Sequence, residues 1–326
     1  AKEGLALING THLMAARAAL LCHDTNVLFE AALVATAMSI DACKATDAFL
    51  DPRVYAARNQ PGPAYVAGRL RQLLRGSRII PSHRRDDPRV QDPYSLRCAP
   101  VVLGAAWDAL RYVEMSVIHE LDAVTDNPLV FAPGSSHPPA SSLPPVVVSA
   151  GNFHGMPMAI PLDTMAIALS HLAGIAERRV FFLLSATDPQ NPLPAYLSPK
   201  PGLHSGLMIA QYTAAACCNE MIGLATPASV ANISTSAGIE DYNSFGPRAA
   251  AKAQRGLELA RRVIAIELMC SAAALDLHRP LKSGRLVERA HSRIRKIVRP
   301  LNEDRPLSAD IERLAGAIAA EQFISP

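Results

Sequence analysis

The stretch LMAARAALLCHDTNVLFEAALVATAMSIDACKA, residues 13–45, decides the predicted fold. Its apolar residues recur at the spacing of one face of an α-helix, and no proline interrupts the run. A proline-free stretch of this length predicts one long helix or two closely coupled helices. The composition favours helices too, because the apolar residues are mostly aliphatic and aromatic residues make up only 5 %.

Seven further stretches show helical spacing, and one of them, 206–225, is apolar nearly all round, which predicts burial on most of its sides. Two short β-like runs, 129–132 and 146–149, flank the turn-rich sequence APGSSHPPASSLPP and predict a surface hairpin with an extended tip. The predicted helices cover residues 64–74, 101–124, 162–184, 206–225, 249–277, 286–298 and 308–320.

Three irregular segments, 76–100, 149–157 and 229–246, connect these helices. The first is too long for an ordinary connection, and loops of that length in compact domains are often functional. The sequence therefore predicts a mainly α protein, a single helical domain over residues 1–326 that forms a long-helix bundle with a small β-hairpin. We expect its site where the three segments meet.

Charge and cysteine patterns exclude several classes of function. The formal net charge is +3, from 32 basic and 29 acidic residues, and the basic clusters are too short for a nucleic-acid-binding face. Arg, Asp or His interrupts the longest apolar runs before a membrane-spanning length, and the first residues do not resemble an export signal. Six cysteines without CxxC or zinc-like spacing predict reduced thiols and a cytoplasmic location.

Six motifs along the chain carry more specific information. They resemble, in order, segments of the ammonia-lyases and aminomutases that act on histidine, phenylalanine and tyrosine, and together they span essentially the whole chain. The motifs are KEGLALINGT (2–11), VQDPYSLRC (90–98), AGNFHGMP (150–157), AERR (176–179), SGLMIAQYTAAA (205–216) and TSAGIEDYNSFG (235–246).

The resemblance implies a helical bundle of the fumarase/aspartase-like type and a methylidene-imidazolone electrophile, formed from an internal Ala-Ser-Gly tripeptide. This electrophile activates the amino acid so that ammonia can leave as a β-proton is removed. No metal or dissociable cofactor is implied. The sequence contains no Ala-Ser-Gly, since residues 149–151 and 236–238 have the order Ser-Ala-Gly.

In the family the tripeptide lies upstream of the KEGLALINGT motif. The chain is therefore expected to correspond to the C-terminal two-thirds of a family member, without the N-terminal domain that forms the electrophile and without the catalytic tyrosine of an early loop. The parts that make and break bonds would then come from elsewhere.

Arg97 is the first candidate substrate-binding residue. A guanidinium group can hold the carboxylate of an amino acid through two hydrogen bonds, and the resemblance gives Arg97 this role. The alternative is a surface arginine paired with Asp92 or Asp86. The resemblance places the hydroxyl of Tyr94 close to the electrophile as a catalytic group, and the alternative is a loop aromatic that only packs.

Three further residues complete the expected surroundings of the electrophile. Asn9 stands before a glycine, which alone indicates a turn, and Gln91 alone would be an ordinary loop residue. The resemblance makes both amides catalytic groups at the electrophile and the substrate. It also places the ring of Phe153 against the electrophile, whereas the residue alone suggests a core aromatic.

Glu240 bears on which substrate is bound, because a carboxylate can accept a hydrogen bond from an imidazole N–H. Histidine lyases of the family tend to have Glu here and phenylalanine lyases Gln. The family commonly has Asn-Gln before this position, where Gly238 and Ile239 stand, and residues 242–244 look more like the phenylalanine version.

Two hypotheses follow. The first is an ammonia-lyase for an aromatic L-amino acid, with histidine giving trans-urocanate as the first choice and a phenylalanine or tyrosine lyase or aminomutase as the alternative. The second is a catalytically incompetent fragment, or a subunit that needs an N-terminal partner chain. The family's members are homotetramers whose sites draw residues from three subunits, so we expect exposed apolar surface on a single chain.

Overall fold

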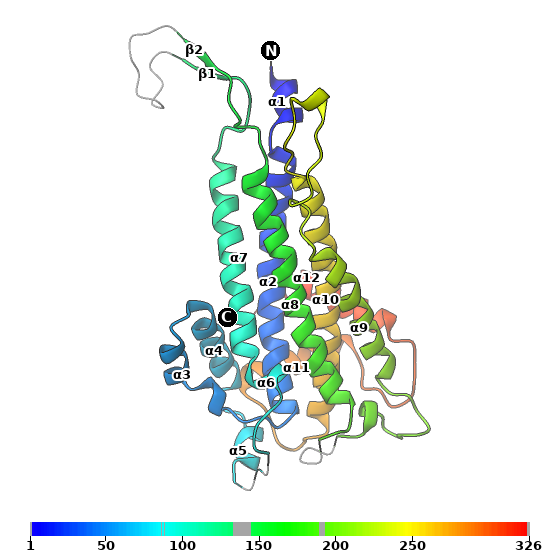
Figure 1. Cartoon of the computed structure of the whole chain (residues 1–326). Helices are drawn as coiled ribbons and strands as arrows, with labels where there is room; N and C mark the ends of the chain where they lie inside the picture. Colours follow the sequence, from blue (N-terminus) through cyan, green and yellow to red (C-terminus); the bar gives the residue numbers. More distant parts are fainter. Residues whose placement is uncertain (1, 86, 88, 133–144, 189–192, 325–326) are drawn as a thin grey trace.

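The computed structural model describes residues 2–85, 87, 89–132, 145–188 and 193–324, which form an elongated bundle of helices (Figure 1). The longer α-helices are α2 (His12–Ala42), α4 (Pro61–Leu74), α7 (Ala99–Leu121), α8 (Met156–Leu184), α9 (Met208–Leu224), α10 (Gly246–Asp276), α11 (Arg285–Ile297) and α12 (Ser308–Ala319). The short ones are α1 (Glu3–Asn9), α3 (Pro52–Arg58), α5 (Ile79–His83) and α6 (Tyr94–Arg97), with 3-10 turns at Ala48–Leu50, Ala195–Leu197 and Ser236–Gly238.

Four long helices, α2, α7, α8 and α10, form the shaft of the bundle. Helix α10 packs against α2, α8 and α9, while α7 packs against α4 and α8. Their facing side chains, such as Leu33, Leu169 and Ile264, are fully buried. The prediction of a long helix at residues 13–45 is confirmed by α2, which ends where Lys44 adopts the left-handed conformation (φ 48°).

The expectation that charged residues keep every apolar run below a membrane-spanning length is wrong for α2 and α8, which are long and apolar enough to cross a membrane by length and composition alone. However, 61 % of the most apolar window of each is buried inside the protein. Burial of this kind is typical of the core helices of a globular protein, and it accounts for their apolar composition without a lipid environment.

Three helices begin three or more residues earlier than the sequence predicted. Helix α4 begins at Pro61 rather than at residue 64, α8 at Met156 rather than 162, and α10 at Gly246 rather than 249. Proline lacks an N–H, but the first turn of a helix leaves its N–H groups unpaired anyway, so proline is tolerated there. Pro161 lies one turn further into α8 and removes a single hydrogen bond close to the helix start.

Helix α9 corrects the expectation that residues 206–225 are buried on most sides. Only a narrow stripe of α9 is buried, whereas side chains such as Ile209, Tyr212 and Ile222 are more than half exposed. The buried stripe is Ala210, Ala214, Cys217 and Met221. The apolar composition therefore leaves a face of α9 uncovered in the single chain.

The predicted hairpin is confirmed. Strands β1 (Leu129–Phe131) and β2 (Val146–Val148) pair antiparallel, with Leu129 opposite Val148. The expected tip falls largely on residues 133–144, which lie outside the described residues.

The three irregular segments do not meet in one place. Segments 149–157 and 229–246 lie together at the end of the bundle that carries α1, while 76–100, which contains α5 and α6, lies at the opposite end (Figure 1). The 31 residues of α2 separate the two ends by about 45 Å, at 1.5 Å per helical residue. The expectation of one meeting point is therefore wrong for the single chain, because long straight helices hold the segments apart.

Candidate functional site

The predicted residues Gln91, Tyr94 and Arg97 lie at one end of the bundle, which we call the Tyr94 end. Tyr94 begins α6, and its side chain is 71 % exposed, whereas Leu96 is fully buried and fixes this short helix to the core. The Arg97 guanidinium carbon lies 4.6 Å from the centre of the Tyr94 ring. The two functional groups thus stand side by side on the outer face of the turn.

Arg97 is held in a way that suits a carboxylate ligand. Its Nε donates a hydrogen bond of 2.8 Å to the backbone carbonyl of Asp92, and no ion pair of Arg97 occurs within the described residues. The alternative pairing with the Asp92 carboxylate is therefore wrong, while Asp86 lies outside the described residues. The terminal nitrogens of Arg97 form the planar fork that binds carboxylates.

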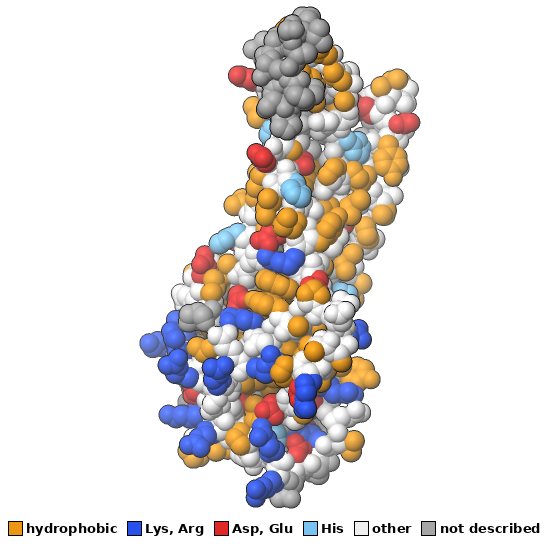
Figure 2. All heavy atoms as spheres, turned by 90° about the vertical axis from the view of Figure 1, so that its left-hand side faces the viewer, with side chains coloured by type: hydrophobic (Ala, Val, Ile, Leu, Met, Phe, Trp, Pro, Cys, Tyr) orange, Lys and Arg blue, Asp and Glu red, His pale blue; other side chains and the backbone are white. Residues whose placement is uncertain are grey.

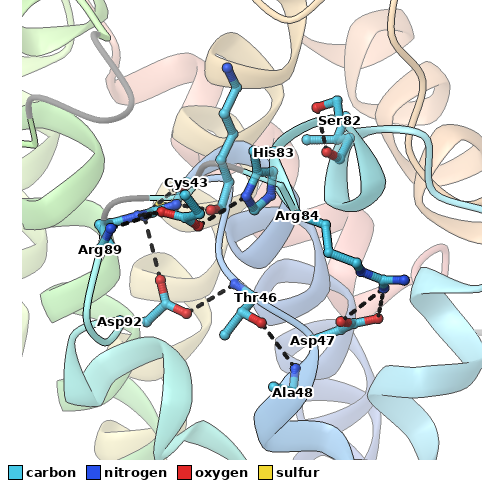
Figure 3. Close-up of polar contacts among 12 residues, drawn as sticks. Cys43, Thr46, Asp47, Ala48, Ser82, His83, Arg84, Arg89 and Asp92 are labelled. Carbon is cyan, nitrogen blue, oxygen red and sulfur yellow. Dashed lines mark hydrogen bonds and ion pairs between the residues drawn. The ribbon is translucent and has the colours of Figure 1, made fainter.

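A polar cluster attaches this segment to the end of α2 (Figure 3). Asp92 is buried, accepts a hydrogen bond from the Thr46 backbone N–H (2.9 Å) and lies 3.4 Å from Arg89 Nη1. The same Arg89 nitrogen donates to the Cys43 carbonyl at 3.0 Å. Burial raises the pKa of the Asp92 carboxyl, although Thr46 and Arg89 act in the opposite direction.

This arrangement could not be predicted from the sequence, because Arg89 and Thr46 belong to no chemical motif of their own. Arg89 directly precedes the VQDPYSLRC motif, which was a signal for this residue, whereas Thr46 lies far upstream of the motif and showed none. A cavity of about 280 Å³ lies beside the cluster, and its lining includes His83, Arg89 and Gln91. Gln91 is exposed at its edge.

The remaining predicted residues lie on segments at the opposite end, which we call the Asn9 end: Asn9 ends α1, Phe153 precedes α8, and Glu240 precedes α10. Asn9 is the exposed last residue of α1, and the next residue, Gly10, sits so close to Thr125 that a Cβ would approach its carbonyl oxygen to 2.6 Å. The Thr11 N–H also donates to Thr125 Oγ1 at 3.3 Å. The Asn-Gly pair is thus a close helix junction and not only a turn.

Phe153 is 40 % exposed in the turn before α8, so the alternative of a core aromatic is wrong. The neighbouring His154 Nε2 lies 2.9 Å from the Tyr242 carbonyl oxygen and links this turn to the segment that carries Glu240. Glu240 is exposed, and its Oε2 accepts a hydrogen bond of 2.8 Å from Thr235 Oγ1. Two segments that lie far apart in sequence therefore place Phe153 and Glu240 at the same end.

Each end alone holds half of the predicted site. The Tyr94 end offers a carboxylate-binding guanidinium, a phenol and an amide, and the Asn9 end offers an amide, an aromatic ring and a carboxylate. Within the described ranges, no three His, Cys, Asp or Glu side chains are placed to hold a metal ion. The predicted residues at the two ends can form hydrogen bonds and ion pairs and can exchange protons with a ligand.

A mainly helical bundle with a small β-hairpin, and with polar residues on segments at its two ends, has the architecture of the ammonia-lyase fold. The chain belongs to the aromatic amino acid lyase family, whose model matches residues 1–296. The resemblance of the six motifs and the predicted fold class are thereby confirmed.

Individual relatives agree with this assignment. Histidine ammonia-lyase of Symbiobacterium thermophilum is 46 % identical over 326 residues, 100 % of this chain and 61 % of the relative. That of Deinococcus radiodurans is 43 % identical, over 99 % of this chain and 59 % of the relative. The crystal structure of the Trypanosoma cruzi histidine ammonia-lyase matches 99 % of this chain and 58 % of that chain, with a TM-score of 0.88 and 39 % identity. The chain thus spans about three fifths of the length of these relatives.

Proposed function

We propose that this chain is the substrate-binding part of a histidine ammonia-lyase, which converts L-histidine to trans-urocanate and ammonia. The observation that carries the proposal is the carboxylate of Glu240 within the TSAGIEDYNSFG motif, in a chain 43–46 % identical to histidine ammonia-lyases. A carboxylate can accept the imidazole N–H, and it would be costly to bury against the apolar side chain of phenylalanine.

In this proposal Arg97 holds the substrate carboxylate through its fork and Glu240 holds the imidazole ring. Binding at both ends of the substrate fixes its position, and such positioning is a major source of catalytic rate. The Tyr94 hydroxyl can donate a proton or a hydrogen bond as charge develops. The amides of Asn9 and Gln91 would orient the electrophile and the substrate, and the ring of Phe153 would pack against the electrophile.

The family's methylidene-imidazolone, when present, supplies an electrophile that activates the amino group of the substrate for departure. The residues of this chain fit such a group. The side chains of Asn9, Gln91 and Tyr94 are exposed, and no hydrogen bond within the described part of the chain engages their polar atoms. Neutral donors and acceptors of this kind suit an uncharged heterocycle with a carbonyl oxygen.

We further propose that the complete site forms between copies of the chain in a homotetramer, in the cytoplasm. An antiparallel neighbour would bring its Asn9 end to the Tyr94 end of this chain. Exposed apolar side chains support such contacts, and Figure 2 shows hydrophobic side chains along the upper shaft, with Lys and Arg gathered below. On α7 they recur every three residues and are each at least 49 % exposed: Tyr112, Met115, Ile118 and Leu121.

A substrate panel tests the proposal. The chain alone, and the chain joined to the upstream part of the Deinococcus radiodurans enzyme, are incubated with histidine, phenylalanine or tyrosine. The ultraviolet absorbance of the unsaturated acid is then followed. We expect histidine turnover in the joined form. Turnover of phenylalanine or tyrosine without histidine would contradict the proposal.

Glu240→Gln sharpens this test. Losing a charged acceptor for the imidazole N–H is expected to lower kcat/KM for histidine about tenfold to a hundredfold, since hydrogen bonds to charged groups contribute about 1.5–3 kcal/mol. Asp241→Asn is the matched control, because it removes the neighbouring exposed carboxylate. An equal fall of kcat/KM for histidine in both variants would contradict the proposed role of Glu240.

A further inference from the structure

Arg179 and Glu267 form an ion pair in the centre of the bundle. Both side chains are completely buried, and Arg179 is among the largest buried side chains of the described residues. Arg179 Nε and Nη2 donate to the two carboxylate oxygens of Glu267 at 2.5 and 2.9 Å, which joins α8 to α10. Arg179 ends the AERR motif, to which the proposed chemistry gives no role.

The remaining guanidinium nitrogen of Arg179 contacts α6, the short helix that carries Tyr94 and Arg97. Arg179 Nη1 donates to the backbone carbonyl of Ser95 at 3.3 Å, inside α6 and between Tyr94 and Arg97. On the other side of the pair, Ser39 of α2 donates to Glu267 at 2.6 Å. One buried network therefore connects three shaft helices to the turn that displays the ligand-binding groups.

Stability alone does not explain this network. Desolvating two charges costs free energy, and well-packed apolar residues of similar volume often serve a fold equally well or better. A guanidinium does what an apolar side chain cannot, because its planar fork holds Glu267 while a third nitrogen reaches Ser95. The contact helps to fix a helix of only four residues, which has few hydrogen bonds of its own.

We propose that Arg179 is a positioning residue, which sets the turn Tyr94–Arg97 so that the Tyr94 hydroxyl and the Arg97 fork face the substrate. Glu267 orients Arg179 for this purpose. The inference rests on the proposed histidine ammonia-lyase function for its substrate, but the anchoring of the turn can be measured without turnover.

Two variants test the anchoring. Arg179→Met combined with Glu267→Met removes both charges at similar volume, and Ser39 keeps the Ser271 hydroxyl at 2.9 Å as a partner. Arg179→Lys keeps the charge opposite Glu267 but lacks the fork. In both, hydrogen exchange of the amides of residues 96–98 is expected to become about tenfold faster, as the loss of one hydrogen bond to a charged group implies. Exchange in the middle of α8 and α10 should stay unchanged.

Arg178→Met is the matched control. Arg178 is the exposed neighbour on α8, pairs with Glu177 and lies over the Phe181 ring. Its loss should leave exchange at residues 96–98 unchanged. Unchanged exchange at 96–98 in both Arg179 variants would overturn the proposal, as would a uniform increase along α8 and α10.

A kinetic readout in the assembled, active enzyme completes the test. A displaced Arg97 should raise the KM for histidine about tenfold, while inhibition by histamine, which lacks a carboxylate, stays the same. An equal loss of affinity for both ligands would mean general damage and would overturn the positioning role. If no histidine turnover is found even without substitution, the proposed function fails, and the exchange experiment still decides whether Arg179 anchors the turn.

Discussion

The Nε of Arg97 is held by a hydrogen bond, while its terminal nitrogens are left for a ligand. Its Nε is committed to the Asp92 carbonyl, and the Tyr94 ring lies beneath the guanidinium. Side chains with many rotamers lose binding free energy when a ligand orders them, so a guanidinium that is already oriented binds a carboxylate at lower cost. The sequence predicted the guanidinium of Arg97 but not the Asp92 carbonyl that holds it. Every residue has a backbone carbonyl, so the residue pattern does not show which one accepts a hydrogen bond.

This geometry gives a graded prediction for two substitutions. Arg97→Ala is expected to lower kcat/KM for histidine about a hundredfold or more, because two charge-assisted hydrogen bonds are lost. Arg97→Lys should restore part of the activity, since an ammonium keeps the charge but not the bidentate geometry. Steady-state kinetics measure both. Identical kinetics for lysine and alanine would show that charge at this position contributes nothing.

At the scale of elements, Asp41 joins three parts of the chain. It lies in the last turn of α2, is fully buried, and accepts hydrogen bonds from Ser77 after α4 and from Ser283 before α11. Burial raises the pKa of this carboxyl to about 6, with smaller contributions in the same direction from Glu288 and Asp47, while the two serines act against the rise. Folding therefore shifts this carboxyl toward its protonated form relative to the unfolded chain.

The pKa of Asp41 predicts a pH-dependent stability. Between about pH 4 and pH 6 the folded state holds a proton that the unfolded state has already released, so the free energy of unfolding falls as pH rises through this window. The contribution amounts to about 3 kcal/mol at 1.36 kcal/mol per pKa unit. Asp41→Asn is neutral at every pH, so its stability relative to the unsubstituted chain should rise across the window.

Denaturant unfolding at a series of pH values measures this difference. Other groups titrate in the same range, but they do so in both proteins and cancel in the comparison. Asp122→Asn, at an exposed carboxyl after α7, serves as the control and should show a constant difference. A constant difference for Asp41→Asn as well would contradict the assigned pKa.

The positions of the helices along the chain could be predicted best from the sequence. Which faces of each helix are buried could be predicted least. The periodicity located α2, α7, α11 and α12 within a few residues, because the spacing of apolar side chains reflects which face is buried. It failed for α9, whose apolar residues cover both its buried stripe and its open face. Composition cannot distinguish a face buried within one chain from a face kept for another chain.

At the scale of the whole molecule, the two ends of the bundle hold different halves of the site. A shared site can be tested by mixing two inactive variants. Asn9→Ala damages the Asn9 end, and Arg97→Ala damages the Tyr94 end. If each site takes its two halves from different chains, mixed oligomers contain intact sites, about a quarter of the total for random assembly of equal amounts.

The experiment unfolds and refolds or co-expresses the two variants and measures histidine turnover. Each variant refolded by itself is the control and should stay nearly inactive. Activity of the mixture that only equals the average of the two variants would mean that both halves come from the same chain, which the separation of about 45 Å makes impossible without a large rearrangement.

The sequence by itself determined the helical class, the order of the long helices and the residue types of the site, because periodicity and local motifs are written along the chain. Only the tertiary structure decided where those residues stand. Straight helices of 29 to 31 residues carry Asn9, Phe153 and Glu240 away from Gln91, Tyr94 and Arg97. The contacts of the partly buried Arg89 and the fully buried Arg179 are likewise tertiary, since each acts on residues that are brought to it by folding.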